Sequence, residues 1–248
     1  MTFPLGIVAS QDSGSPAFTP NYVTFDGSST YLDLGGALSG TPTPADGKTF
    51  LFYANLEADT DGVNLNVLLS SDSRVYAFRR SSNTFRVRLR DTAGGTLIQI
   101  TSSATVAAAD GKVNVLVSVD TATNYAEMYF DDTLVASDYV IPANDIDYTS
   151  STDWGLFGSS TGVSKFSGVA GNCYVAINQT KLDIGSTVSA ATGEANRRLF
   201  YDASGVPTDL SGAPTPIIQF TDVASEWNSG TMDAVATGGD WNMNGSVT

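Results

Sequence analysis

The stretch Thr84-Phe-Arg-Val-Arg-Leu-Arg90 alternates without interruption between apolar side chains and arginines. Successive side chains of a β-strand point to opposite faces, so its apolar residues share one face and its arginines share the other. A helix would repeat its apolar positions every three to four residues instead. The stretch therefore predicts a strand with one face in a core and one cationic face, which carries Arg86, Arg88 and Arg90.

The same period of two recurs along most of the chain, with turn residues every 8–14 positions. Residues 48–55 are apolar nearly throughout and predict a central strand, whereas 113–119 place four valines on one face. Residues 125–130 turn at Asp131-Asp132 into 133–136, which predicts a tight hairpin. One helix is expected, near 192–200. Parallel strands need crossover helices, and the sequence predicts only one helix. The predicted fold class is therefore an all-β, antiparallel two-sheet β-sandwich.

Shifts in composition divide the chain into three parts. Residues 1–20 are rich in Gly, Pro and Ser and predict an extended N-terminal arm. Residues 21–180 hold the regularly spaced strands and predict the sandwich. Residues 181–248 predict a C-terminal extension, made of the short helix, a strand and loops, that packs on the sandwich.

Composition excludes several classes of function. The formal net charge of the 248 residues is -14, so neither nucleic acid nor an anionic membrane is expected as a partner. The sequence has no histidine, which excludes Ser-His-Asp and Cys-His catalysis and zinc sites that need imidazole. The single cysteine, Cys173, is expected to be buried. The N-terminus lacks the basic region of a signal peptide, so we expect a cytoplasmic protein that later joins an assembly.

Three stretches resemble the laminin-G-like branch of the concanavalin A-like family. They are the strand pair Tyr22-Val-Thr-Phe-Asp-Gly-Ser-Ser-Thr-Tyr-Leu-Asp-Leu34, the paired strands of 113–135, and the glycine-flanked strands of 154–175. Residues 196–220, followed by Trp227-Asn-Ser-Gly and the segment 238–247, are similar to a tail found after such sandwiches in tailed-phage structural proteins. The resemblance implies a jelly-roll sandwich.

The resemblance also implies a function. It predicts a non-enzymatic virion protein, a head decoration, head fibre or tail-associated subunit on the particle surface, which binds other virion subunits and further copies of itself. A carbohydrate-binding adhesin that recognises host polysaccharide is the alternative. A glycoside hydrolase ranks last, because such enzymes on this fold carry acid-x-acid-x-x-acid on one strand and Glu57-Ala-Asp-Thr-Asp61 has other spacing. Glu127, between Tyr125 and Tyr129, is expected on a half-exposed sheet face.

Calcium is the one cofactor to consider, since laminin-G-like domains bind it at a sandwich rim with aspartate and backbone carbonyl oxygens. The candidate ligands are Asp26, Asp131 and Asp132. All of them are also ordinary turn formers, which explains their positions without a metal.

Half of the 12 basic residues fall within 17 positions of an otherwise acidic chain. These six are all arginines: Arg74, Arg79, Arg80, Arg86, Arg88 and Arg90. They form either a solvated face or edge that blocks aggregation, or a dock for an acidic neighbour such as a virion subunit, another copy or an anionic glycan. Exposed aromatic rings could stack on sugars, and the candidates are Tyr31, Trp227 and Trp241.

Overall fold

The computed structural model describes residues 22–39, 43–70, 74–159, 164–185, 189–220 and 242–245. The expected N-terminal arm and the candidate sugar-stacking residues Trp227 and Trp241 lie outside these ranges. In the described part, no helix is long and apolar enough to cross a membrane.

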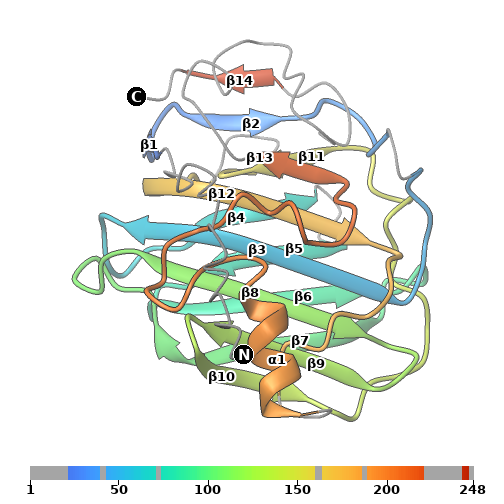
Figure 1. Cartoon of the computed structure of the whole chain (residues 1–248). Helices are drawn as coiled ribbons and strands as arrows, with labels where there is room; N and C mark the ends of the chain where they lie inside the picture. Colours follow the sequence, from blue (N-terminus) through green and yellow to red (C-terminus); the bar gives the residue numbers. More distant parts are fainter. Residues whose placement is uncertain are drawn as a thin grey trace, which may run out of the picture.

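Two antiparallel sheets pack face to face, as Figure 1 shows. The front sheet has the order β1-β12-β3-β8-β9-β10, with β13 beside β12, and the back sheet has the order β14-β2-β11-β4-β5-β6-β7. This arrangement is a jelly-roll β-sandwich and confirms the predicted fold class. The strands are β1 (Val23–Asp26), β2 (Tyr31–Asp33), β3 (Thr49–Ala58), β4 (Leu65–Ser70), β5 (Val75–Arg79), β6 (Thr84–Arg90), β7 (Thr96–Thr105), β8 (Val113–Asp120), β9 (Tyr125–Phe130), β10 (Thr133–Asp138), β11 (Trp154–Leu156), β12 (Ser167–Ile177), β13 (Ile218–Phe220) and β14 (Asn242–Asn244).

The core between the sheets follows the predicted alternation. The apolar residues of β6 are fully buried, whereas its arginines are half-exposed. The four valines of β8 lie in the same core. Cys173 of β12 is buried there as expected, and the predicted hairpin joins β9 to β10 with Asp131 at a positive φ of 50°, a conformation that aspartate tolerates.

The central strands of the front sheet are buried on both faces, which periodicity did not predict. Every residue of β8 and β9 is buried, including the polar side chains that alternate with the valines. The cover is the C-terminal extension, which lies in front of the sheet in Figure 1. Phe200, Tyr201 and Leu210 of the extension pack with Tyr53 and Tyr174 in a second hydrophobic cluster.

The extension is built into both sheets. Strand β13 pairs with β12 of the front sheet, and β14 pairs with β2 of the back sheet. Helix α1 (Ala190–Arg197) begins two residues and ends three residues earlier than expected. The reason is Ser189, whose side chain accepts a hydrogen bond from the backbone N–H of Thr192 and so caps the first turn.

Candidate functional site

The outer face of the back sheet carries the arginines of β6 between polar and aromatic neighbours. In the register of β5 with β6, Tyr76 lies opposite Arg88 and Phe78 lies opposite Arg86. On the other side, β7 places Thr101 opposite Arg86 and Gln99 opposite Arg88. We call this surface the arginine face and define it by Tyr76, Phe78, Arg80, Arg86, Arg88, Arg90, Gln99 and Thr101.

Aromatic rings hold the guanidinium groups in place. The guanidinium carbon of Arg88 lies 4.9 Å from the ring centroid of Tyr76, and that of Arg86 lies 5.9 Å from the ring of Phe78. The Nε of Arg86 donates to Thr101 Oγ1 at 3.0 Å. A planar guanidinium that rests on a ring loses less freedom when it binds an anion, so these contacts preorganise the face.

Neighbouring arginines of this face make the charged form of Arg86 and of Arg88 less favourable. Burial, and after it the neighbouring charge of Arg80, lowers the pKa of Arg86 from its ordinary value. Burial, and then the charges of Arg90 and Arg86, lowers the pKa of Arg88 in the same way. The four side chains therefore form one row of like charge, which an external anion would stabilise.

The arginines of the row have no acidic partner among the described residues, whereas most of the other cations do. Seven of the 12 basic residues form ion pairs: Lys48, Arg74, Arg79, Lys112, Lys181, Arg197 and Arg198. An eighth, Lys165, lies over the ring of Tyr31. Within the described part of the chain, no carboxylate pairs with the remaining four, which are Arg80, Arg86, Arg88 and Arg90.

Two of the six arginines in the predicted cluster stabilise the fold instead. Arg79 is only 1% exposed; it donates to the backbone oxygen of Thr60 and to Asn83. Alternation could have shown this, because residues 75–79 place Arg79 on the same side as the core residues of β5. Arg74 pairs with the fully buried Asp147 at 3.2 Å. Neither side chain is free to bind a partner. The candidate docking residues are therefore Arg80, Arg86, Arg88 and Arg90.

The candidate calcium ligands are all engaged within the protein. The carboxylate of Asp26 accepts hydrogen bonds from the backbone and hydroxyl groups of Ser28, Ser29 and Thr30. The hydrogen bonds from Ser29 chiefly lower the pKa of Asp26 far below its ordinary value. In the described ranges, no three acidic or cysteine residues gather closely enough to hold a metal ion. Turn formation accounts for Asp26 without one.

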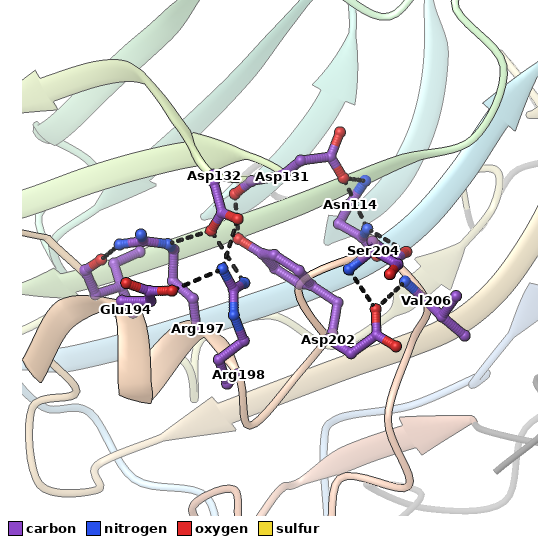
Figure 2. A network of polar contacts seen from close by, with 12 residues as sticks. Asn114, Asp131, Asp132, Glu194, Arg197, Arg198, Asp202, Ser204 and Val206 are labelled. Atoms are coloured by element: carbon purple, nitrogen blue, oxygen red, sulfur yellow. Dashed lines mark hydrogen bonds and ion pairs between the residues drawn. The ribbon is translucent and has the colours of Figure 1, made fainter. Parts of the chain in front are cut away.

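Asp131 and Asp132 attach the extension to the front sheet, as Figure 2 shows. The backbone oxygen of Asp131 accepts a hydrogen bond from the hydroxyl group of Tyr201, and Asp132 lies between Arg197 and Arg198. Arg198 reaches both carboxylate oxygens of Asp132, at 3.0 and 2.6 Å, and these hydrogen bonds lower the pKa of Asp132. Sequence analysis missed this role because it depends on contacts between residues that lie about 65 positions apart in the sequence.

Arg197 is the counterpart of the exposed arginines on this covered face. Its Nε pairs with Asp132 Oδ1 at 3.0 Å, and its Nη1 donates to the backbone oxygen of Ile184 at 2.6 Å. Its guanidinium also lies over the ring of Tyr129, at 4.5 Å from the centroid. The chain itself thus supplies this cation with a carboxylate, a backbone carbonyl oxygen and an aromatic ring.

Glu127 is buried, and the prediction of a half-exposed position was wrong. It is 1% exposed and accepts hydrogen bonds from the hydroxyl groups of Tyr125, at 3.0 Å, and Tyr139. The extension covers this face, which periodicity cannot reveal. Burial, and then the hydrogen bond to Glu127, raises the pKa of Tyr139 to about 12. The group is thus a buried structural contact.

The other glutamates of the described residues are also engaged. Glu57 pairs with Lys112 at 3.5 Å, and Glu194 pairs with Arg198 at 3.2 Å. Tyr31, the remaining sugar-stacking candidate, is half-buried with Lys165 Nζ 5.3 Å from its ring centroid. Its strand, β2, is separated from β5 by β11 and β4, so Tyr31 does not belong to the arginine face.

No protein-family model and no curated protein matches the chain. Solved structures with similar folds include the heptameric SAP-like pentraxin of Limulus polyphemus, with a TM-score of 0.45 and 10% identity over 62% of this chain and 74% of that one. The CBM40 module of the Ruminococcus gnavus IT-sialidase, bound to α2,3-sialyllactose, has a TM-score of 0.45 and 13% identity over 60% and 85%.

Domains LG4-5 of the mouse laminin α1 chain have a TM-score of 0.44 and 13% identity over 68% of this chain and 46% of that one, so this chain spans about half of that fragment. These structures are concanavalin A-like sandwiches. The jelly-roll assignment of this chain rests on its own strand order.

Proposed function

We propose that this chain is a non-enzymatic docking module of a tailed-phage particle, and that Arg80, Arg86, Arg88 and Arg90 attach it to an acidic partner. One observation carries the proposal: in a chain of net charge -14, four arginines with which no carboxylate of the described residues pairs lie in a single row. A row of desolvated like charges is unfavourable alone and favourable against a complementary surface.

The position of β6 in its sheet argues against the alternative of an edge that blocks aggregation. Strand β6 lies between β5 and β7, and the edge of the sheet is β7. Charges that block aggregation are needed on edge strands, where backbone groups are unpaired. Tyrosine and arginine together are also the residues enriched where protein interfaces bind most strongly.

The phage setting of the proposal rests on the resemblance of residues 196–220 to the tail of phage structural proteins. In this chain the stretch supplies the end of α1, the cover of the front sheet and β13. With that face covered, the back sheet is the face through which such a subunit would contact its neighbours.

Charge reversal tests the proposal directly. We expect the triple substitution Arg86→Glu, Arg88→Glu and Arg90→Glu to leave the domain folded by circular dichroism and to abolish its incorporation into particles. The matched control replaces the same three residues with lysine, which preserves the charge and should retain most of the incorporation. Normal incorporation of the glutamate variant would refute the docking role.

A carbohydrate-binding adhesin is the second candidate, because unpaired guanidinium groups also suit the carboxylates of acidic sugars. Binding of the chain to a glycan array would favour it, and loss of that binding with a chelator would implicate calcium. Glycan binding that survives the glutamate substitutions would place the sugar site away from the arginine face.

A further inference from the structure

We infer that the partner of the arginine face is an extended acidic polypeptide segment that carries Asp or Glu at every second residue and lies along β6. The inference rests on the proposed docking function and specifies the chemistry of its ligand. It draws on the spacing of the arginines, on how their guanidinium groups are held, and on what covers the aromatic rings.

The spacing of the row matches an extended peptide. Arg86, Arg88 and Arg90 are alternate residues of one strand, so their Cα atoms recur roughly every 6.6–6.8 Å. An extended peptide places its own alternate side chains on one side at the same repeat. Three acidic residues at every second position can therefore meet the three arginines one to one, whereas three contiguous acidic residues place only two on that side.

The guanidinium groups are prepared for carboxylates. Arg86 uses only its Nε within the described protein, on Thr101, so its terminal nitrogens remain available. Arg88 lies on Tyr76 with its Nε buried, and within the described protein its terminal nitrogens form no hydrogen bond. A carboxylate can accept two parallel hydrogen bonds from such a fork, and lysine cannot provide them.

The aromatic rings are poorly placed to bind sugars or nucleobases. Stacking of either kind needs an open ring face. Here Arg88 lies over Tyr76 and Arg86 over Phe78, and Phe78 is only 7% exposed. The rings thus support the arginines. The net charge of -14 further opposes a polynucleotide.

Binding of defined probes to the full chain tests the inference. One probe is a short peptide in which three glutamates alternate with threonines, and its control has the same composition with the three glutamates contiguous. An oligogalacturonate and an oligothymidylate represent the acidic sugar and the nucleic acid. Fluorescence polarisation at low and at physiological ionic strength measures the dissociation constants, because charge pairing weakens with salt.

We expect the alternating peptide to bind about fivefold or more tightly than the block peptide. The Arg→Lys triple variant should bind both peptides more weakly, since lysine lacks the bidentate geometry. The Arg→Glu triple variant should bind neither peptide. A variant with Lys48, Lys112 and Lys165 changed to Glu has the same net charge and should keep the preference.

The outcomes separate this inference from the docking function. Equal binding of the two peptides, lost in the Arg→Glu variant, would refute the requirement for an acidic residue at every second position. It would leave the proposed docking to an acidic partner intact. Tighter binding of oligogalacturonate or oligothymidylate through the same arginines would overturn the ligand class. Failure of every probe, together with normal particle incorporation of the Arg→Glu variant, would overturn both.

Discussion

The two outer faces of the sandwich each carry an arginine that lies over a tyrosine ring, but the surroundings of the two arginines differ. On the covered front sheet, Arg197 lies 4.5 Å from the ring centroid of Tyr129 and pairs with Asp132. On the back sheet, Arg88 lies 4.9 Å from the ring of Tyr76, and no carboxylate of the described residues pairs with it. Arg197 is a structural contact because the chain supplies its acid, whereas Arg88 is the binding group in the function that we propose.

The largest expected effect concerns the cover of the front sheet. Phe200→Ala removes a fully buried ring that packs 5.2 Å from Tyr53 and 5.5 Å from Tyr174, measured between centroids. We expect the free energy of unfolding to fall by about 3–5 kcal/mol in urea denaturation. The control Val206→Ala, on a 39% exposed residue of the same extension, should change it by less than about 0.5 kcal/mol. Equal effects would mean that the extension is not a packed cover.

The next effect concerns the cation of the covered face. Arg197→Met keeps an apolar side chain but leaves the backbone oxygen of Ile184 without its donor and breaks the pair with Asp132. We expect a loss of about 2 kcal/mol, within the range for a buried acceptor left unsatisfied. Arg198→Met removes a more exposed pair and should cost less than about 1 kcal/mol. A larger loss for Arg198 would reverse the assignment of Arg197 as the anchor.

A smaller effect should appear as a dependence on pH. The hydrogen bond from Arg198 lowers the pKa of Asp132 in the folded state. Stability from a depressed carboxyl pKa is complete above the unfolded value of about 3.9 and is lost as the pH falls through the folded value. The difference in unfolding free energy between the native chain and Asp132→Asn should therefore be constant near neutrality and shrink below about pH 4. A difference that persists unchanged into acid would exclude the charge of Asp132 as its source.

The contrast between the two faces also explains what could be predicted from the sequence. The strand period placed Phe85, Val87 and Leu89 in the core and the arginines of β6 outside, because alternation is a local property of a strand. It did not reveal that Glu127 is buried, because the cover comes from residues that follow it by more than 50 positions. Local patterning therefore predicted the open face well and the covered face only in part.

The same distinction applies to the candidate site. Six clustered arginines were treated alike in the sequence. Alternation along residues 75–79 could have separated Arg79, which lies on the core side of its strand, but only tertiary contacts separate Arg74. The partners of Arg74 and Arg79 lie in other loops, at Asp147 and Thr60, and a sequence pattern does not report such pairs. The arginines of β6 were predictable as a group because they required only that a strand alternate.

The smallest expected effect on stability tests the comparison most sharply. Arg88→Met removes a cation–π contact worth about 0.5–1 kcal/mol, but it also relieves repulsion from Arg86 and Arg90 and the cost of burying a charge. These terms oppose each other, so the free energy of unfolding should change by less than about 0.5 kcal/mol, in contrast to Arg197→Met. Affinity for an acidic peptide should nevertheless fall by about fivefold to tenfold, as expected for the loss of one charge-assisted pair. If Arg88→Met instead unfolded the chain as readily as Arg197→Met, the arginine face would be part of the scaffold, and its unpaired charges would need another explanation.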